Sequence, residues 1–161
     1  MQSDNEKMLQ EIVQNTEMGK NTLDEMLGLT RDQRLKNEMM RQKNEYRRLN
    51  QQAHTALAAL DACGACGVKA IAGKIATGDT FVGDAATKKS IEEKCHPDCV
   101  EMEGAAVSQI AARNGVPCVI LRAMSDNADE SGYEVLVVKQ FSIAEYIKTA
   151  TEIVAHMIES L

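Results

Sequence analysis

The chain has 161 residues, of which 44% are hydrophobic and 26% are charged. This size suffices for one domain with a buried core, and the composition excludes a chain that is disordered throughout. Its 24 acidic and 18 basic side chains give a formal charge of −6, which argues against duplex nucleic acid or an anionic membrane as the main partner, because both attract basic surfaces.

The two parts of the chain, residues 1–60 and 61–161, differ in composition. The first part holds nine basic and nine acidic side chains but no cysteine or proline, whereas the second holds all five cysteines, both prolines and eight of the ten glycines. This contrast predicts a helical segment followed by an α/β layer structure. No apolar run reaches the roughly 18 residues of a membrane span, and the first ten residues lack the apolar core of a signal peptide. We therefore expect a cytoplasmic protein whose cysteines are free thiols.

The first part predicts two helices that form an αα-hairpin. Ser3 and Glu6 have the spacing of a capping box, which places a helix start between them, and Gly28 is the expected C-cap. Thr30 to Gln33 repeats the capping pattern and opens a second helix. Its apolar positions, spaced by threes and fours with Gln42 interrupting, are Leu35, Met39, Tyr46, Leu49, Ala53, Ala56 and Leu60. The rest of the chain, a second copy or a partner must cover this apolar stripe.

The second part predicts strands that alternate with helices. In chain order we expect a strand over 68–76, a helix over 88–94, a strand over 99–102, a helix over 104–113 capped by Gly115, a buried strand over 118–124 and a helix over 142–161. This order indicates a parallel or mixed sheet flanked by helices. In such sheets, ligands bind beyond the carboxyl ends of the strands.

Three polar clusters stand at those strand ends. They are Thr77-Gly78-Asp79-Thr80-Phe81, Glu101-Met102-Glu103-Gly104 and Arg122-Ala123-Met124-Ser125-Asp126. With their flanks, IATGDTFV and VEMEGAAVSQIAARNGVPCVILRAMSDNAD, they resemble the C-terminal half of the 5′-methylthioadenosine/S-adenosylhomocysteine nucleosidases, in the group of purine nucleoside and uridine phosphorylases. The resemblance implies a helical segment over 1–49 and a nucleosidase-like α/β domain over 50–161, with part of the mixed sheet of that fold.

The resemblance also implies an activity, which is hydrolysis of the N-ribosidic bond of adenine nucleosides such as methylthioadenosine and adenosylhomocysteine, in methionine salvage. It implies a small-molecule substrate, no cofactor, no metal, and a homo-oligomer such as a dimer. By resemblance, Asp126 is the acid that protonates the departing purine, and Ser125 holds its carboxyl group. The residues alone leave an alternative open, in which Asp126 caps a turn.

Six further residues receive roles from the resemblance. Glu103 accepts hydrogen bonds from the ribose hydroxyls, which strengthen as the sugar gains positive charge, and Met102 packs on the sugar. Phe81 stacks on adenine, and Val82 offers backbone groups to the purine. Glu101 and Arg122 form a buried charge pair at the floor of the site. Without the resemblance, Glu103 reads as a first-turn helix carboxylate satisfied by the helix macrodipole, which is common, and a residue such as Phe81 is more often a core side chain than a platform.

The chain also departs from that pattern. Nothing in residues 1–60 matches the N-terminal half of such a nucleosidase, which carries the glutamate that activates water, so we expect an incomplete site and impaired hydrolysis. The alternative function is a non-catalytic helical interaction protein with a remnant nucleoside site. A third reading, a metal or redox site, would use the C-x-x-C of Cys63 and Cys66 with Cys95, His96 and Cys99, but their places at a helix end, in a loop and on a strand disfavour it.

Overall fold

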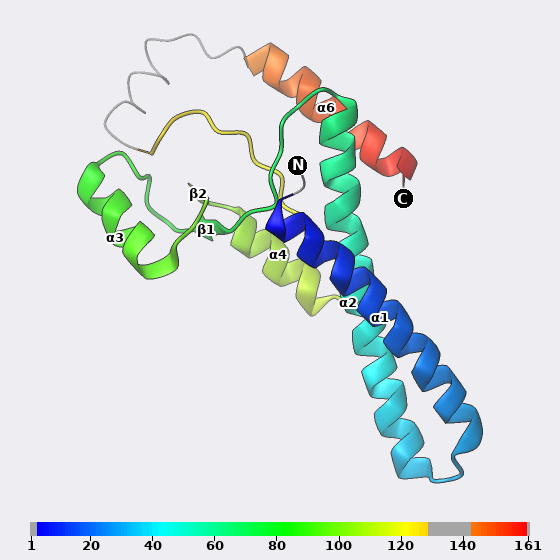
Figure 1. The fold of residues 1–161 in the computed structure, drawn as a ribbon. Helices are drawn as coiled ribbons and strands as arrows, with labels where there is room; N and C mark the ends of the chain where they lie inside the picture. The colour runs from blue at the N-terminus through cyan, green and yellow to red at the C-terminus, as the bar shows by residue number, and fades with distance from the viewer. Residues whose placement is uncertain (1–2, 129–142, 161) are drawn as a thin grey trace.

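The computed structural model describes residues 3–128 and 143–160 of the chain. Its elements are α1 (Asp4–Leu29), α2 (Gln33–Ala65), β1 (Ile75–Thr77), α3 (Ala85–Cys95), β2 (Cys99–Glu101), α4 (Gly104–Arg113) and α6 (Ile143–Ser160). The α1–α2 hairpin extends away from the two strands, and α6 packs on the C-terminal half of α2 (Figure 1). Among the described helices, none combines the length and the apolar character needed to cross a lipid bilayer.

The start of α1 confirms the predicted capping box. The Ser3 N–H donates to Glu6 Oε2 at 2.8 Å, and the Glu6 N–H donates to Ser3 Oγ at 3.2 Å, so two N–H groups that lack helical partners are satisfied. The predicted C-cap at Gly28 is wrong, because the helix continues through Leu29. The chain leaves the helix at Thr30, which has an extended backbone (φ −83°) and donates its N–H to the Met26 carbonyl.

The second helix is capped by Asp32 rather than by Thr30. Asp32 Oδ1 accepts from the Arg34 and Leu35 N–H groups at 2.8 and 3.2 Å, and Thr30 Oγ1 accepts from the Asp32 N–H. Asp is a better N-cap than Thr, and its carboxylate also interacts favourably with the positive end of the helix dipole.

Buried contacts within the hairpin fix its register. Asn50 Nδ2 donates to Thr16 Oγ1 at 3.0 Å and to the Val13 carbonyl at 3.2 Å. Gly19 lies against the ring of Tyr46 so closely that a Cβ at position 19 would stand 2.6 Å from the ring. The predicted αα-hairpin is therefore present, with a polar pair inside its apolar interface.

The hairpin joins the rest of the chain through a small core at the end of α2. Buried Ala62 and Cys63 of α2 pack with Ile153 of α6, and the partly buried residues around them are Cys66, Val68, Ala70 and Met157. The final helix is therefore held on α2 by small and flexible apolar side chains.

The two strands pair in parallel, with Ile75 opposite Cys99 and Thr77 opposite Glu101. The helix α3 connects them, and α4 begins directly after β2, so the fold is a helix-rich α/β structure with a small parallel sheet and an N-terminal hairpin. The predicted Gly115 cap is present: Gly115 has φ +67° and donates to the Ala112 carbonyl, while Val116 donates to the Ala111 carbonyl. These two bonds form a Schellman motif, which needs the left-handed backbone that glycine adopts without strain.

Two strand predictions are wrong. The expected strand over 68–76 is reduced to Ile75–Thr77, and the apolar run Cys118–Met124 forms no strand. A strand exists only where its backbone groups pair with a neighbour, and among the described residues only β1 and β2 pair. The second half of the run is accordingly exposed, with Leu121 at 41% and Met124 at 58%. Residues 142 and 161 of the expected final helix lie outside the described part.

Candidate functional site

The carboxylate of Glu101 is the centre of a cluster at the carboxyl ends of β1 and β2. Its Oε2 accepts from the Gly104 N–H at 2.6 Å, from the Glu103 N–H at 3.1 Å and from Arg122 Nη2. Its Oε1 accepts from the Thr77 hydroxyl, which in turn accepts from the Ala105 N–H at 3.0 Å. One carboxylate therefore ties together both strands, the start of α4 and the run that contains Arg122.

These donors keep Glu101 ionised. Burial of the carboxylate, whose side chain is only 8% exposed, would raise its pKa. The hydrogen bonds from Thr77, from the two backbone N–H groups and from Arg122 outweigh burial and lower the pKa from 4.5 to about 2. The contacts also raise the pKa of Arg122. The predicted pairing of Glu101 with Arg122 is thus present as a charge-assisted hydrogen bond, but it is buried only at Glu101, because the Arg122 side chain is 30% exposed.

Gly104 lies in close contact with this carboxylate. A Cβ built on Gly104 would lie 3.0 Å from Glu101 Oε1 and 3.1 Å from its Oε2, tighter than an ordinary van der Waals contact. With a side chain at position 104, the carboxylate or the first turn of α4 would have to shift by a few tenths of an ångström. The glycine therefore lets the first turn of α4 approach the end of β2.

Arg122 also binds Glu103, the residue directly before α4. Its Nη2 donates to Glu103 Oε2 at 2.8 Å, and the Glu103 side chain is 67% exposed. Glu103 stands at the N-cap of α4 but makes no capping hydrogen bond with its side chain. Glu103 therefore stands at the start of α4, as a first-turn helix carboxylate would, but its side chain is bound by Arg122, which holds it next to Glu101.

Ser125 and Asp126, which follow Arg122 by three and four residues, form a second, local hydrogen-bonded group. The Ser125 hydroxyl donates to Asp126 Oδ2 at 2.7 Å, and the Ala128 N–H donates to Asp126 Oδ1 at 2.7 Å. Lys88 of α3 donates to the Asn127 carbonyl at 2.9 Å, which joins this segment to α3. Within the described residues, no hydrogen bond or ion pair connects Asp126 with Glu103.

The side chains of the remaining residues that the sequence singled out form no described hydrogen bond or ion pair with this cluster. Phe81 is 53% exposed and its ring lies against Gly83, where a Cβ would stand 2.9 Å from the ring. Val82 is buried, and Met102 is 43% exposed. The structure thus brings Glu101, Glu103 and Arg122 together and pairs Ser125 with Asp126; the roles of Phe81, Val82 and Met102 stay predictions.

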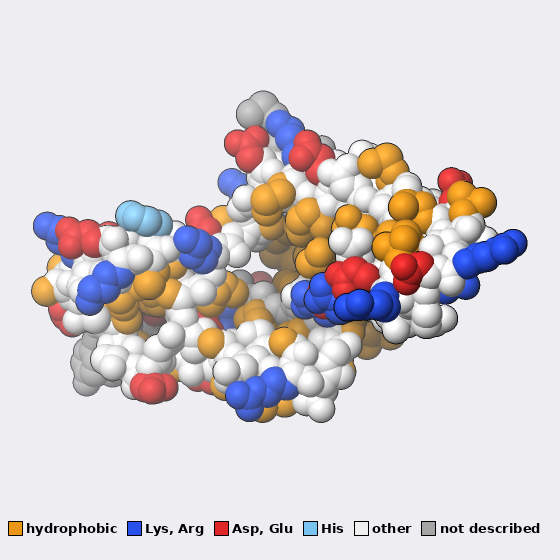
Figure 2. Space-filling model, turned by 90° about the horizontal axis from the view of Figure 1, so that it is seen from below, with side chains coloured by type: hydrophobic (Ala, Val, Ile, Leu, Met, Phe, Trp, Pro, Cys, Tyr) orange, Lys and Arg blue, Asp and Glu red, His pale blue; other side chains and the backbone are white. Residues whose placement is uncertain are grey.

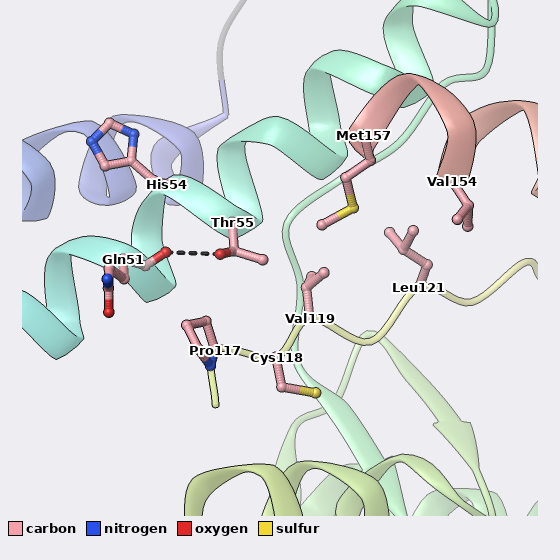
Figure 3. A pocket seen from close by; sticks show the side chains of 9 residues that line it. All are labelled: Gln51, His54, Thr55, Pro117, Cys118, Val119, Leu121, Val154 and Met157. Atoms are coloured by element: carbon pink, nitrogen blue, oxygen red, sulfur yellow. Dashed lines mark hydrogen bonds between the residues drawn. The ribbon is translucent and has the colours of Figure 1, made fainter. Parts of the chain in front are cut away.

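A cavity of about 770 Å³ lies elsewhere, between α2, α6 and the run after Pro117 (Figure 3). Mostly apolar side chains line it, among them Cys118, Val119, Leu121, Val154 and Met157, with Gln51, His54 and Thr55 from α2. Thr55 is bound to its own helix, because its hydroxyl donates to the Gln51 carbonyl at 2.8 Å. None of the residues predicted for the nucleoside site lines this cavity.

The cysteines are free thiols in the described structure. Cys63 is buried, and burial together with the neighbouring Cys66 raises its pKa, which disfavours the reactive thiolate. Burial, Glu101 and Asp98 likewise raise the pKa of Cys99. Within residues 3–128 and 143–160, no three His, Cys, Asp or Glu side chains are arranged to hold a metal ion.

The sequence placed Thr77 and Gly104 in the polar clusters without giving either residue a role, and it gave none to Lys88. Strand register is the signal that could have found Thr77, because two parallel strands that end in Thr77 and Glu101 place these residues opposite each other. The glycine after an E-M-E cluster pointed to a tight turn into a helix. The contact between Lys88 and Asn127 joins segments 39 residues apart, and local patterning holds no signal for it.

Comparisons with known proteins place these observations in a family. The model of a family described as the phosphorylase superfamily matches residues 27–159, from the last turn of α1 to the last turn of α6. The aminodeoxyfutalosine nucleosidase of Campylobacter jejuni is 39% identical over 100 residues, which are 62% of this chain and 41% of that protein. The 5′-methylthioadenosine/S-adenosylhomocysteine nucleosidase of Geobacillus kaustophilus is 36% identical over 97 residues, which are 59% of this chain and 38% of that protein.

Solved structures that resemble this chain also include nucleoside hydrolases. A futalosine hydrolase of Helicobacter pylori superposes with a TM-score of 0.59 at 29% identity, over 67% of this chain and 45% of that chain. A 5′-methylthioadenosine/S-adenosylhomocysteine nucleosidase of the same organism, complexed with a pyrrolidine ligand, gives 0.59 at 30% identity over the same shares. The chain thus spans less than half the length of each of these relatives.

Proposed function

The chain belongs to the phosphorylase superfamily, and from this membership we propose that its three polar clusters form part of a site for an adenine nucleoside, whose N-ribosidic bond is hydrolysed there. One observation carries the proposal: Arg122 joins Glu101 and Glu103 beyond the carboxyl ends of two parallel strands, where α/β folds bind ligands. The names of the relatives, which are nucleosidases and a futalosine hydrolase, support the same class of reaction.

Glu103 is the proposed ribose ligand. Arg122 occupies its Oε2, and among the described residues no donor bonds to its Oε1, so this oxygen is available to a ribose hydroxyl. The guanidinium holds the carboxylate in place. A charged acceptor next to a sugar that becomes positive stabilises the transition state more than the ground state.

Asp126 is the proposed acid. As the bond between C1′ and the purine nitrogen breaks, its electron pair moves to the purine, and the Asp126 proton passes to N7 of the base. Water adds its hydroxyl to C1′, and the remaining proton of that water restores the acid. The Ser125 hydroxyl, 2.7 Å from Asp126 Oδ2, orients the carboxyl group. We assign the activation of water to no described residue.

Phe81 is the proposed platform for the base, because its ring, 53% exposed in the segment between β1 and α3, offers aromatic surface for stacking. The 5′ group of the substrate is the open part of the proposal. Methylthioadenosine, adenosylhomocysteine and aminodeoxyfutalosine share the base and the ribose, and the relatives divide between them.

Release of the base from these three nucleosides, followed by chromatography, tests the proposal. We expect release from at least one of them, and a loss of about 100-fold or more in Asp126→Asn. Glu92→Gln, an exposed carboxylate of α3, is the matched control and should keep the wild-type rate. Equal rates in Asp126→Asn and the wild type would overturn the role of Asp126.

A second candidate, a non-catalytic interaction protein, is favoured by a different observation. The α1–α2 hairpin extends away from the strands and carries exposed apolar side chains (Figure 1). Binding of a nucleoside without release of its base would support this candidate with a remnant site.

A further inference from the structure

One side of the α1–α2 hairpin is hollowed into a groove of about 540 Å³. The residues that line this hairpin groove all belong to the two helices: Ile12, Asn15, Thr16, Met18, Gly19, Thr22, Leu23, Gln42, Tyr46 and Leu49. Two of its apolar side chains are open to solvent, with Met18 at 65% and Leu49 at 41% exposure. Such an exposed apolar surface marks a place where another helical surface binds.

The apolar surface continues beyond the groove toward both ends of the hairpin. Met8 and Met26 on α1 are 52% and 44% exposed, and Leu35 on α2 is 45% exposed. The strands and α4 lie beside the start of α1, and the tip of the hairpin extends away from them (Figure 1). Seen from below, toward the tip of the hairpin, apolar side chains lie beside acidic and basic groups (Figure 2).

The two helices of the hairpin have opposite charge. Helix α1 carries six acidic and two basic side chains, a net charge of −4, whereas residues 33–60 of α2 carry six basic and two acidic side chains, a net charge of +4. Within the hairpin, Lys43 of α2 and Asp24 of α1 form an ion pair between the oppositely charged helices. A surface that covers the groove must therefore offer a basic helix to α1 and an acidic helix to α2.

Charged and apolar side chains beside the groove recur at a spacing of seven residues along each helix. Glu11, Met18 and Glu25 lie on one line along α1, because seven residues are close to two helical turns. Leu35, Gln42 and Leu49 lie on one line along α2, and Arg34, Arg41 and Arg48 lie on a parallel line. Glu11, Glu25 and Arg34 take part in no ion pair within the described residues. Charged side chains beside an apolar line are the pattern that selects partners in helical bundles.

We propose that the hairpin groove of a second copy covers this groove, so that two hairpins form a four-helix bundle in which α1 of each copy packs against α2 of the other. The hairpin itself is the surface that offers a basic and an acidic helix side by side. A twofold axis parallel to the helices gives this pairing. A twofold axis perpendicular to them would place α1 against α1, with −4 facing −4.

Sedimentation of the full chain at concentrations up to about 100 µM tests the proposal. We expect a dimer in the wild type, and Leu49→Glu should raise its dissociation constant about 30-fold or more, because the substitution buries a charge at the centre of the interface. Met40→Glu is the matched control, because Met40 is 47% exposed on α2 and does not line the groove. Circular dichroism checks that both variants keep their helices. A monomeric wild type, or a dimer that Leu49→Glu leaves unchanged, would overturn the proposal.

A double variant tests the pairing of α1 with α2. Glu11→Lys with Glu25→Lys removes the net charge of α1, so the dimer should weaken about tenfold. Glu92→Lys with Glu93→Lys changes the total charge by the same amount on α3 and should leave the dimer unchanged. Tighter association of the α1 variant would contradict the pairing and indicate α1 against α1. Because these residues lie outside the nucleoside cluster, loss of the dimer and loss of base release are separate outcomes.

Discussion

Thr77 and Glu101 stand opposite each other at the ends of two parallel strands, and the Thr77 hydroxyl donates a hydrogen bond to the Glu101 carboxylate. The same hydroxyl accepts from the Ala105 N–H, so it links the end of β1 to α4. Because Arg122 and two backbone N–H groups also bind Glu101, this pair holds in place the residues that we assign to the ribose.

The stability of the protein should depend on the ionisation of Glu101. Its pKa is about 2 in the folded chain against 4.5 ordinarily, so its contribution is fully present above about pH 4.5 and is lost as the pH falls toward 2. Glu101→Gln should lower the free energy of unfolding by about 1–3 kcal/mol near neutral pH. The difference from the wild type should shrink between pH 4.5 and 2.

Urea unfolding of both proteins across this pH range measures the effect, with Glu92→Gln as a control for the loss of an exposed carboxylate. A difference between wild type and Glu101→Gln that stays constant down to pH 2 would show that Glu101 is not the titrating group.

Gly104→Ala should destabilise the cluster. The new Cβ would meet the Glu101 carboxylate at 3.0 Å, and the carboxylate or the first turn of α4 must move. We expect a loss of about 1–3 kcal/mol in the free energy of unfolding, measured by urea titration. Gly28→Ala is the matched control: its Cβ would meet nothing within 4 Å inside α1, and it should stabilise the chain by about 0.5–1 kcal/mol. Two alanine variants of equal stability would contradict the contact at Gly104.

Gly19→Ala should loosen the hairpin. A Cβ on Gly19 would stand 2.6 Å from the ring of Tyr46, so the helices must separate or the ring must leave its place. We expect a lower melting temperature and faster amide exchange in α1, with a loss of about 1–3 kcal/mol. The double variant with Tyr46→Leu, which removes the ring, should recover part of this stability. No recovery would mean that the ring is not the cause.

Local patterns were sufficient for the helices. The capping box at Ser3, the helix over Gly104–Arg113 and the glycine after it are set by residues close in sequence, and the structure confirms them. Gly28 was misjudged because a C-cap depends on where the chain must turn, and Thr30 and Asp32 make that turn.

The features that could not be predicted from local sequence depend on pairing between segments far apart in the chain. The run Cys118–Met124 has the composition of a buried strand, but composition cannot supply the neighbouring strand that it would need. The pairing of Glu101 with Arg122 was predictable only through the resemblance, because 21 residues separate them in the sequence. The contact of Thr77 with Glu101 required the strand register, which the sequence pattern left open.

Calorimetric titration with methylthioadenosine and with adenine tests most directly whether the clusters around Glu103, Phe81 and Asp126 bind an adenine nucleoside. The account predicts one binding site per chain for both ligands. Glu103→Gln should weaken the nucleoside by about 10- to 100-fold and leave adenine unchanged, because only the nucleoside carries ribose hydroxyls. Absence of binding by the folded wild-type chain, or equal weakening of both ligands, would contradict it.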